Sequence, residues 1–357
     1  MAVWRWSACD LKTGLMAAEL PLKPGGTIAT RLSAVGSGGF YMPTTDPACP
    51  PDWDLAVIED RTVIVGEVND QILWHGMVSQ LRITDKPVVD ITCNTTESYT
   101  ERRYVDNPIG PLINTDQHDI VAALIGHANV NGIGIVMDAP ASGVRRDRTE
   151  YQRYEDQQIL AMLENLSEAD QGPEWTLHAS WLPGAPRRLQ FTMVVRTPYI
   201  GAAIADPTWR FDLPGNVVSF EQIRGERSNV VVAGGQGDGA ERIMSTSGIA
   251  HDTAALAAGW PLLEYRHATQ LETREAVDAA AKGELETRRR GAQTLKLTIK
   301  TENMPDGSMW GLGDTARIAI APCPQLPRGL NEVWRITGWE LDPLKDTVSP
   351  TLMQWQG

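Results

Sequence analysis

Residues 54–94 read DLAVIEDRTVIVGEVNDQILWHGMVSQLRITDKPVVDITCN, and this stretch decides the fold class. Short apolar runs recur in it at 55–58, 63–65, 72–78 and 88–93, and polar or turn-forming residues separate them. Runs of this length with turn chemistry between them predict a meander of antiparallel strands. In the last run apolar and polar residues alternate, so one face of that strand is expected to be buried and the other exposed to solvent. The stretch therefore predicts the wall of a β-barrel.

The composition is that of an acidic globular protein. The chain has 357 residues, 42% of them hydrophobic, and a formal net charge of −13. The length predicts two or three domains with packed cores. The negative charge argues against a general nucleic-acid binder, which would carry an excess of Lys and Arg. Two interpretations of the acidity remain open: a contribution to solubility, which we favour, and an acidic channel through which DNA slides without sticking.

The cysteines and the apolar runs indicate the compartment. No C-x-x-C motif is present, so the cysteines predict neither a metal cluster nor a redox pair, and free thiols in a reducing cytoplasm are expected. The N-terminus lacks the apolar core of a signal peptide, and no run approaches the ~20 residues of a membrane helix. We therefore expect synthesis in the cytoplasm and no direct membrane insertion. The cysteines are Cys9, Cys49, Cys93 and Cys323.

The middle of the chain changes to a helical period. Residues 117–128 predict a helix with Asp116 as its N-cap, and residues 154–168 predict a second helix. Residues 174–182 and 187–196 then predict a β-hairpin. The segment is therefore expected to form a small α+β domain whose helices cover the apolar face of its sheet.

A local basic run, GVRRDR at 143–148, lies between the two predicted helices. It is unusual because the chain around it is acidic. One interpretation is a contact for an acidic partner, and the other is a solvated loop. We favour the loop.

Strands return in the last part of the chain, where residues 294–300 alternate strictly between polar and apolar side chains. Thr269, with Glu272 three residues later, predicts a capping box at the start of a helix. The arginines at the end of this helix lie where the macrodipole favours cations, so they do not require nucleic acid. Further strands are predicted at 217–223, 229–233, 316–320, 333–341 and 347–355.

The strongest candidate for a ligand site is the glycine-rich run GGQGDG at 234–239, directly after a predicted strand. Such a turn binds a pyrophosphate when a helix follows and presents its N-terminal amides. Here the spacing is G-G-x-G-x-G, no apolar helix is predicted to follow, and no parallel βαβ unit is predicted around it. We therefore favour a hairpin tip or an inter-domain turn.

No other pattern predicts a reaction. The histidines form no zinc motif, and no G-x-S-x-G elbow is present, so we predict no catalytic, cofactor-binding or metal-binding residue. His75 is expected to be a packed or edge residue of its strand. A carboxylate pair for glycoside hydrolysis stays open, because only the fold can place such a pair.

The tryptophans are numerous, 12 against 4 phenylalanines, and either packing or sugar stacking explains them. Packing is favoured because five of them fall inside predicted strands. Trp209, Trp260 and Trp310 lie near turns and are expected to be exposed and to contact neighbouring subunits. The five strand tryptophans are Trp4, Trp6, Trp74, Trp334 and Trp339.

Several of these segments together resemble a known family. The strand WHGMV at 74–78 and the segment ERRY at 101–104 resemble the first barrel of the siphophage tail hub proteins. These are the minor tail or baseplate-hub proteins of phages that infect actinobacteria. The segment LPL at 20–22 resembles the one that leads into that barrel. Further on, GLGDTARIAI at 311–320 and WRITGWEL at 334–341 resemble the second barrel.

This resemblance implies a structural subunit of the tail tip in the virion. In the family, a homotrimer forms a ring in which the two related barrels alternate, and DNA passes through its lumen at ejection. The implied partners are the distal tail protein, the tape-measure protein and other minor tail or receptor-binding proteins.

The residues and the resemblance together predict a β-rich α+β fold with two hub-type antiparallel β-barrel domains and an α+β insert between them. The predicted domains are 1–111, 112–200 and 201–357, the last containing a helix at about 269–290. We predict that the protein is not an enzyme and uses no cofactor. Two alternatives stay open: a tail-associated cell-wall-degrading enzyme and a carbohydrate-binding protein.

Overall fold

The chain forms two compact units. The computed structural model describes residues 4–148, 150–169, 171–201, 209–237, 239–269, 271, 273–289, 291, 293–300 and 311–354. The main unit comprises Met1–Phe220 and Lys296–Gly357, and the small unit comprises Glu221–Leu295. The small unit is thus an insertion into the sequence of the main unit.

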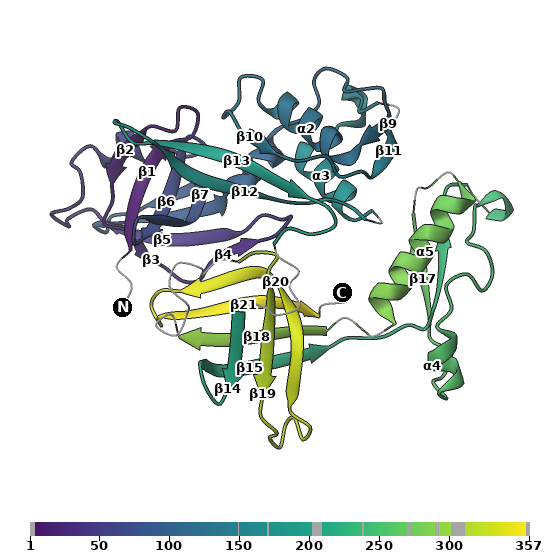
Figure 1. The fold of residues 1–357 in the computed structure, drawn as a ribbon. Helices are drawn as coiled ribbons and strands as arrows, with labels where there is room; N and C mark the ends of the chain where they lie inside the picture. The colour runs from purple at the N-terminus through teal and green to yellow at the C-terminus, as the bar shows by residue number, and fades with distance from the viewer. Residues whose placement is uncertain are drawn as a thin grey trace. The chain divides into compact units, whose positions relative to one another are not determined.

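The predicted meander is the centre of the first sheet in the main unit (Figure 1). This seven-stranded sheet has the order β2-β1-β6-β7-β8-β5-β3, and each neighbouring pair is antiparallel. The alternation predicted for the last run is confirmed, because Val89, Ile91 and Cys93 are buried. The strands are β1 Arg5–Asp10, β2 Met16–Glu19, β3 Lys23–Pro24, β5 Ser37–Pro43, β6 Thr62–Val68, β7 Gln71–Ile83 and β8 Val88–Thr95.

The first run of the meander is not a strand. Its first two residues fall in α1, Trp53–Ala56, a single helical turn that leaves Leu55 exposed, and Val57 is the extended residue that ends this turn. The Thr62 side chain stabilises the turn, because its hydroxyl accepts from Ile58 N at 2.9 Å and donates to Ala56 O at 2.9 Å. A short apolar run cannot distinguish a helical turn from a strand, and here side-chain bonding decides.

The predicted helices and hairpin of the middle segment are present. Helix α2, Gln117–Ala128, has the predicted bounds, and Asp116 caps it by accepting from His118 N at 2.9 Å. Helix α3 begins only at Ile159, because Asp156 takes a left-handed φ of 51° after a 3-10 turn. The remaining elements are η1 Thr96–Arg102, β9 Leu112–Asp116, β10 Val136–Asp138, β11 Arg145–Arg148, η2 Arg153–Glu155, α3 Ile159–Ser167, β12 Glu174–Leu182 and β13 Arg188–Arg196.

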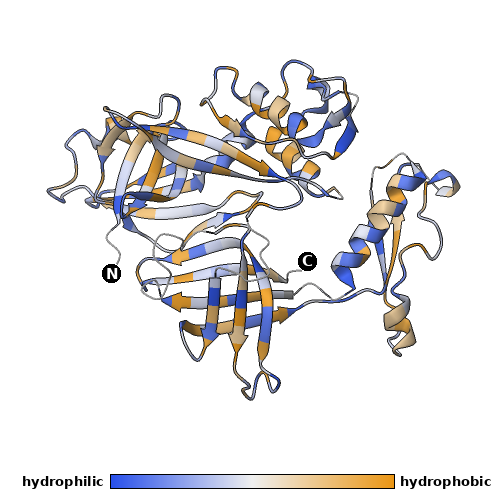
Figure 2. Cartoon of the chain, viewed as in Figure 1, coloured by the Kyte–Doolittle hydropathy of each residue, from blue (hydrophilic) through white to orange (hydrophobic). Residues whose placement is uncertain are grey.

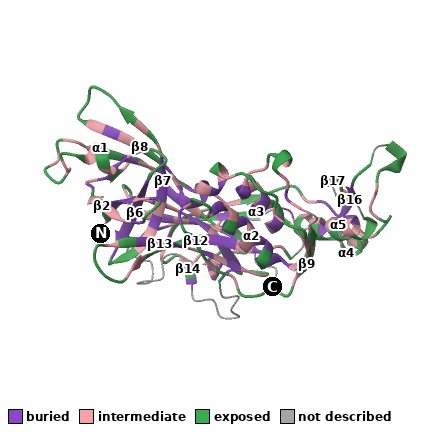
Figure 3. Cartoon of the chain, turned by 90° about the horizontal axis from the view of Figure 1, so that it is seen from above, coloured by how far each residue is buried: buried purple, intermediate pink, exposed green. Residues whose placement is uncertain are grey.

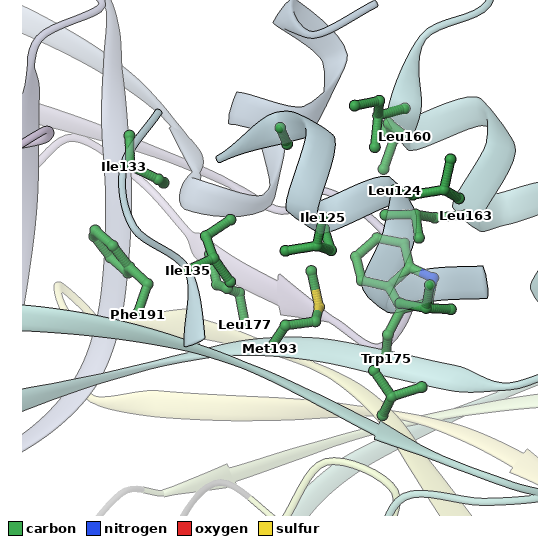
Figure 4. Packing of buried hydrophobic residues seen from close by; sticks show 14 of the residues in the cluster. Leu124, Ile125, Ile133, Ile135, Leu160, Leu163, Trp175, Leu177, Phe191 and Met193 are labelled. Carbon is green, nitrogen blue, oxygen red and sulfur yellow. The ribbon is translucent and has the colours of Figure 1, made fainter. Parts of the chain in front are cut away.

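The middle segment and the first sheet share one hydrophobic core. Its members include Val63 and Met77 of the first sheet, Leu124 of α2, Leu163 of α3 and Trp175 of β12. Figure 3 shows buried residues concentrated along β6, β7, β12 and β13. In Figure 4 the helix side chains meet those of the hairpin across this core, as expected for helices that cover the apolar face of a sheet.

The second sheet of the main unit is also seven-stranded. Its path is β14-β19-β20-β21-β18-β15, and hydrophobic and hydrophilic residues alternate along its strands (Figure 2). The pairing of β14 with β19 is parallel, so the sheet is mixed and not wholly antiparallel as predicted. The strands are β14 Trp209–Leu213, β15 Val217–Arg224, β18 Gln293–Lys300, β19 Thr315–Ile320, β20 Leu330–Asp342 and β21 Thr347–Gln354.

The seventh strand of that sheet comes from the N-terminal part of the chain. Strand β4, Ile28–Arg31, pairs antiparallel with β20, where Ile28 faces Leu341 and Arg31 faces Gly338. Leu32 N extends the contact by donating to Thr337 O at 2.8 Å. The two large sheets are therefore not consecutive in sequence, which the sequence patterns did not predict.

The small unit is an α/β module. It contains β16 Val230–Gly234, η3 Gly239–Glu241, α4 Thr253–Ala257, β17 Glu264–Ala268 and α5 Arg274–Arg288. Strands β16 and β17 are parallel, which corrects the prediction that no parallel unit surrounds the glycine-rich run. Helix α5 packs on β16, with Val277, Ala281 and Leu285 in the core.

The start of α5 differs from the prediction. Thr273 is the N-cap, and its hydroxyl accepts from Ala276 N at 3.3 Å. Thr269 instead uses its backbone N–H to bond Gly234 O at 2.7 Å, so it belongs to the end of β17. The partner in the predicted capping box, Glu272, lies outside the described residues.

Candidate functional site

A cavity of about 320 Å³ lies in the main unit, where the first sheet, the hairpin and the second sheet meet. Its walls come from β4, β7, the start of η1, β12 and residues 200 and 311–312. Polar side chains line it, including those of Arg31, His75, Glu97 and His178. Because these residues lie far apart in sequence, only the tertiary fold brings them together.

Glu97 is the buried acid of this cavity. It is the second residue of η1 and only 5% exposed. Its Oε1 accepts from Leu177 N at 3.1 Å, whereas among the described residues Oε2 has no hydrogen-bond partner. Burial raises the pKa of Glu97, and hydrogen bonds from its own backbone, from Thr95 and from Leu177 oppose that rise. The carboxyl is therefore held in place by several hydrogen bonds, of which the one from Leu177 N reaches Oε1.

His75 bonds the carbonyl oxygen of the same residue, Leu177. Its Nε2 lies 3.0 Å from Leu177 O, and its Nδ1 lies 2.9 Å from Thr96 Oγ1. A carbonyl only accepts, so Nε2 carries the proton and Nδ1 accepts from the Thr96 hydroxyl. Burial lowers the pKa of His75 to about 4, which keeps the ring neutral near pH 7. The expectation of a packed histidine in the WHGM strand is thus confirmed.

The rest of the wall carries charges of both signs. His178 is exposed into the cavity, and burial, together with His75, lowers its pKa while Glu97 opposes the shift. Arg31 is exposed on β4. No group of three or more His, Cys, Asp or Glu side chains in the described part of the chain has metal-binding geometry. Among the described residues, the ionisable groups of the cavity wall are therefore one carboxyl group, one guanidinium and two imidazoles.

The glycine-rich run after β16 is not a phosphate cradle. Gly235 N donates to Ile243 O at 2.7 Å, and Gln236 N donates to Leu271 O at 2.9 Å. A Cβ on Gly235 would lie 2.3 Å from Leu271 O, so glycine is required there for close backbone approach. These amides are already used within the small unit, and a pyrophosphate would have to displace their partners.

Most of the tryptophans in question pack inside the protein and do not present an exposed ring to a neighbouring subunit or a sugar. Trp6, Trp74, Trp334 and Trp339 are buried within strands, as predicted, whereas Trp4 precedes β1 and is only partly buried. Trp209 was expected at the surface but is 1% exposed, because β14 is a strand of the second sheet and its ring packs against Trp339 at 5.6 Å.

Two tryptophans remain from the group predicted to be exposed. Trp260 of the small unit is 44% exposed and lies 3.9 Å from the guanidinium of Arg227. Trp310 lies outside the described residues.

The basic run at 143–148 is partly a strand. Most of it forms β11, which pairs with β9, and Asp116 accepts from Gly143 N at 2.8 Å. Arg146 Nε donates to Gln117 Oε1 at 2.7 Å, and Arg145 donates to Asn114 O at 2.6 Å. Both arginines therefore have bonds within the protein. Most of the run is a strand and not a loop, although Arg145 stays exposed to solvent, as the solvated interpretation predicted.

The cysteines are free, as the sequence predicted. Cys9 and Cys93 are buried, and burial raises the pKa of Cys9 to about 12. Both are thus inert thiols of the core. In the part of the chain that the structure describes, no helix is long and apolar enough to span a membrane.

Glu97 and Arg31 are the residues of the cavity that sequence reasoning missed. Glu97 stands in the run TTES with no motif around it, and Arg31 stands in a short segment between turns. No local pattern marks either residue, because their importance comes from the cavity that long-range pairing builds.

No protein-family model matches this sequence, and no curated protein matches it. Solved structures do. The tail protein from Neisseria meningitidis MC58 is similar with a TM-score of 0.60 at 14% identity, over 99% of this chain and 97% of that one. The 43 kDa tail protein of prophage MuSo2 from Shewanella oneidensis has a TM-score of 0.59 at 12% identity, over 99% and 98%.

A third structure extends the likeness. Prophage tail protein gp18 from Listeria monocytogenes EGD-e has a TM-score of 0.57 at 12% identity, over 98% of this chain and 94% of that one. Each likeness covers nearly the whole of both chains, including both large sheets and the insertion between β15 and β18. The chain therefore has the fold of phage tail proteins, in agreement with the resemblance to tail hub proteins found in its sequence.

Proposed function

We propose that this chain is a structural subunit of the phage tail tip, the baseplate hub, and that it forms a ring at the distal end of the tail tube. The likeness to tail proteins over nearly the full length of both chains carries this proposal.

Two ion pairs inside the main unit support a rigid structural role. Glu67, 1% exposed on β6, pairs with Arg187 at 2.7 Å and accepts from Trp181 Nε1 at 2.8 Å. Glu174 of β12 pairs with Arg335 of β20. The first pair fixes the hairpin to the first sheet, and the second fixes it to the second sheet. Breaking a buried pair leaves an uncompensated charge, so both contacts resist separation of these layers.

The proposed oligomeric state, barrels and partners follow from the resemblance to the tail hub family. Three copies would form a homotrimer in which each large sheet closes as a hub-type barrel, with domains 1–111, 112–200 and 201–357. The ring would sit on the distal tail protein of a siphophage tail, contact the tape-measure protein and carry other minor tail or receptor-binding proteins. DNA would pass through its lumen at ejection.

The acidity of the chain supports the passage of DNA. A net charge of −13 disfavours phosphate binding, so a lumen lined by carboxylates lets a duplex slide without adsorbing. Replacing carboxylates that line the lumen with lysine should slow ejection in a salt-dependent way. Unchanged ejection kinetics would contradict the sliding role while leaving the structural role intact.

The proposed role is not enzymatic. Sugar stacking needs exposed aromatic faces, and the strand tryptophans Trp6, Trp74, Trp334 and Trp339 are buried. The alternatives of a carbohydrate-binding or cell-wall-degrading tail protein therefore gain no support from them.

The decisive test is to locate the chain in phage particles. Virions carrying it are purified, their proteins are identified by mass spectrometry, and the tail is reconstructed by cryo-electron microscopy without imposed symmetry. We expect density for this fold as a three-subunit ring at the tail tip with a pore wide enough for duplex DNA. Absence of the chain from the virions, or its location away from the tip, would overturn the proposal.

A further inference from the structure

We propose that the small unit binds a second copy of this chain through the Trp260 surface, which consists of Arg227 and residues 257–262. The surface that it binds is the acidic turn, residues 52–60, in the main unit of that copy. This inference rests on the proposed ring, because it names the two surfaces by which successive copies join.

The first step is an exposed apolar run in the small unit. Residues 257–262 read AAGWPL, and all six are exposed to solvent. Trp260 is 44% exposed and Leu262 is 57% exposed. The run is held in place by its neighbour, because Asn229 Nδ2 donates to Pro261 O at 2.7 Å. A fixed and exposed apolar surface is typical of a site where another protein binds.

The second step is the guanidinium of Arg227, which lies 3.9 Å from the centre of the Trp260 ring. Its Nε donates to Arg289 O at 3.1 Å, and its Nη2 donates to the same oxygen. Among the described residues, Nη1 has no partner and no carboxylate pairs with this arginine. The stack therefore fixes a positive charge beside an exposed ring without neutralising it. Arg and Trp are also the residue types that most often dominate the affinity of protein interfaces.

The third step is the acidic turn of the main unit. Residues 32–60 contain five carboxylates and no Lys, Arg or His. Three of the carboxylates, those of Asp52, Asp54 and Glu59, are exposed and form no ion pair within the described part of the chain. Leu55 lies among them in the sequence and is 73% exposed. The turn therefore presents an exposed leucine together with unpaired negative charges.

The fourth step is the match between the two surfaces. The Trp260 surface has an apolar run and a guanidinium without a carboxylate partner. The acidic turn has an apolar side chain and carboxylates without a cationic partner. Contact between them covers Trp260 and Leu55 and gives Arg227 its counter-charge. Opposite charges also favour this pairing over contact of either surface with its own copy.

The fifth step is the choice of a second copy as the occupant. Every copy of the chain carries both surfaces, so the contact joins two different surfaces and is heterologous. Heterologous contacts pass from copy to copy and close into a ring when the rotation allows. This is the kind of assembly that the proposed function requires. Single-stranded nucleic acid could also stack on Trp260 and pair with Arg227, but it would leave the acidic turn without a partner.

The test measures self-association of the full-length protein by sedimentation velocity over a series of concentrations. We expect wild-type protein to associate with a Kd below about 1 mM. The association should weaken as salt rises from about 50 mM to about 500 mM, because salt screens charges at a surface contact.

Truncation of either surface should weaken the association. Trp260→Ala should raise the Kd about thirtyfold, as expected for the anchor of an interface, and Leu55→Ala about tenfold. Both side chains are exposed, so both variants should keep the fold, which circular dichroism checks. Arg274→Glu is the control for the small unit, because it reverses an exposed charge at the opposite end of α5 from Arg289. It should leave the Kd unchanged.

A charge exchange tests the pairing of the two surfaces. Arg227→Glu and Asp54→Lys should each abolish association at low salt, because each places like charges at the contact. The double variant Arg227→Glu/Asp54→Lys reverses both surfaces and should restore association in part. Arg227→Glu/Glu332→Lys is the matched control, since Glu332 is an exposed carboxylate of β20 in the main unit. It should not restore association.

A mixture of two variants shows that the contact is between copies. Trp260→Ala keeps the acidic turn intact, and Leu55→Ala/Asp54→Lys keeps the Trp260 surface intact. Each variant alone should stay monomeric at concentrations where wild-type protein associates. Their mixture should form complexes of two chains that grow no further, because only one contact per pair is possible.

Several outcomes overturn the inference. These are wild-type protein that stays monomeric up to about 1 mM, unchanged association of Trp260→Ala or Leu55→Ala, or no complex in the mixture. Binding of a single-stranded DNA oligonucleotide that Trp260→Ala abolishes, without self-association, would assign the surface to nucleic acid instead. If Arg227→Glu does not fold, the truncations and the mixture still decide.

The outcome is separable from that of the virion experiment. A ring at the tail tip in which these two surfaces do not meet would overturn this inference and leave the proposed function intact. Self-association by this contact in a chain that is absent from virions would overturn the proposed function alone.

Discussion

The main unit and the small unit are stabilised in different ways. The core of the main unit gathers residues from the first sheet, from α2 and α3 and from the β12–β13 hairpin, and two ion pairs connect the layers around it. The core of the small unit has six buried residues, contributed mainly by β16 and α5. The first depends on contacts between distant parts of the sequence, and the second on local ones. We therefore expect core substitutions in the main unit to lower its free energy of unfolding strongly. Substitutions in the small unit should destabilise that unit without affecting the main one.

The largest effect is expected in the shared core. Trp175 is fully buried between α3 and the hairpin, as Figure 4 shows. Trp175→Ala should lower the free energy of unfolding by about 3–5 kcal/mol, because it removes a large apolar surface and leaves a cavity. Chemical denaturation with circular dichroism measures this change. An effect below about 1 kcal/mol would show that the core is less cooperative than its packing indicates.

The next effect concerns the connection between the hairpin and the second sheet. Arg335→Ala leaves Glu174 without its counter-charge and removes bonds to Gly313 O and Ile200 O, each 3.0 Å long. We expect a loss of about 3 kcal/mol in the free energy of unfolding. The double variant Glu174→Gln/Arg335→Met should lose less, because it removes both charges. If the double variant loses as much free energy of unfolding as the single one, the contact between the hairpin and the second sheet depends on packing and not on charge.

A smaller and separable effect is expected in the small unit. Leu285 is 8% exposed in its core, so Leu285→Ala should cost about 2 kcal/mol, at the low end for such a change. Differential scanning calorimetry should show one transition that moves to lower temperature and a second, from the main unit, that does not. A single transition that shifts as a whole would contradict the separation of the two units.

The N-cap residues of α2 and α5 allow the same comparison for single capping hydrogen bonds. In the main unit, Asp116 accepts from His118 N, from Ser142 N and Oγ, and from Gly143 N, and these bonds lower its pKa to about 2. Asp116→Ala should cost about 1–2 kcal/mol at neutral pH. A lowered pKa means that the stabilisation is present above the ordinary value near 4 and is lost as pH falls towards 2. Wild type and variant should therefore converge in stability over that range, and parallel curves would disprove the assignment.

The smallest effect is expected at the cap of α5. Thr273 makes one cap bond of 3.3 Å, so Thr273→Ala should cost about 0.5 kcal/mol, detected as a shift of the small unit's transition alone. Thr269→Ala is the comparison, since that residue does not cap the helix and its hydroxyl makes only two long bonds, to Gly234 O at 3.3 Å and from Leu271 N at 3.4 Å. If Thr269→Ala has the larger effect, the helix begins where the sequence pattern placed it.

The elements that the sequence predicts well are those whose signals are local. The bounds of α2 and the capping role of Asp116 follow from spacing and side-chain chemistry within a few residues. Strand β12 has its predicted bounds and β13 starts one residue late, because a proline and glycine turn separates two clear apolar patterns.

The features that escaped prediction depend on distant partners. The pairing of β4 with β20, the burial of Trp209 by a parallel strand and the approach of Glu97 to Leu177 each join residues far apart in the chain. A local sequence pattern of about ten residues does not indicate which distant residue will be the partner. The cavity is made only of contacts of this kind. From the sequence alone, its residues therefore could not be identified as better site candidates than other polar residues.

The pairing of β4 with β20 has a consequence for how the chain is made. Residues 28–31 are synthesised long before their partner residues 338–341, because roughly 300 residues of chain lie between them. At the usual rate of translation this interval is on the order of tens of seconds. During that time β4 has a free edge, and such edges pair readily with other chains. A newly made chain is therefore exposed to wrong pairing at this edge until residues 338–341 have been synthesised, and the second sheet cannot be completed before then.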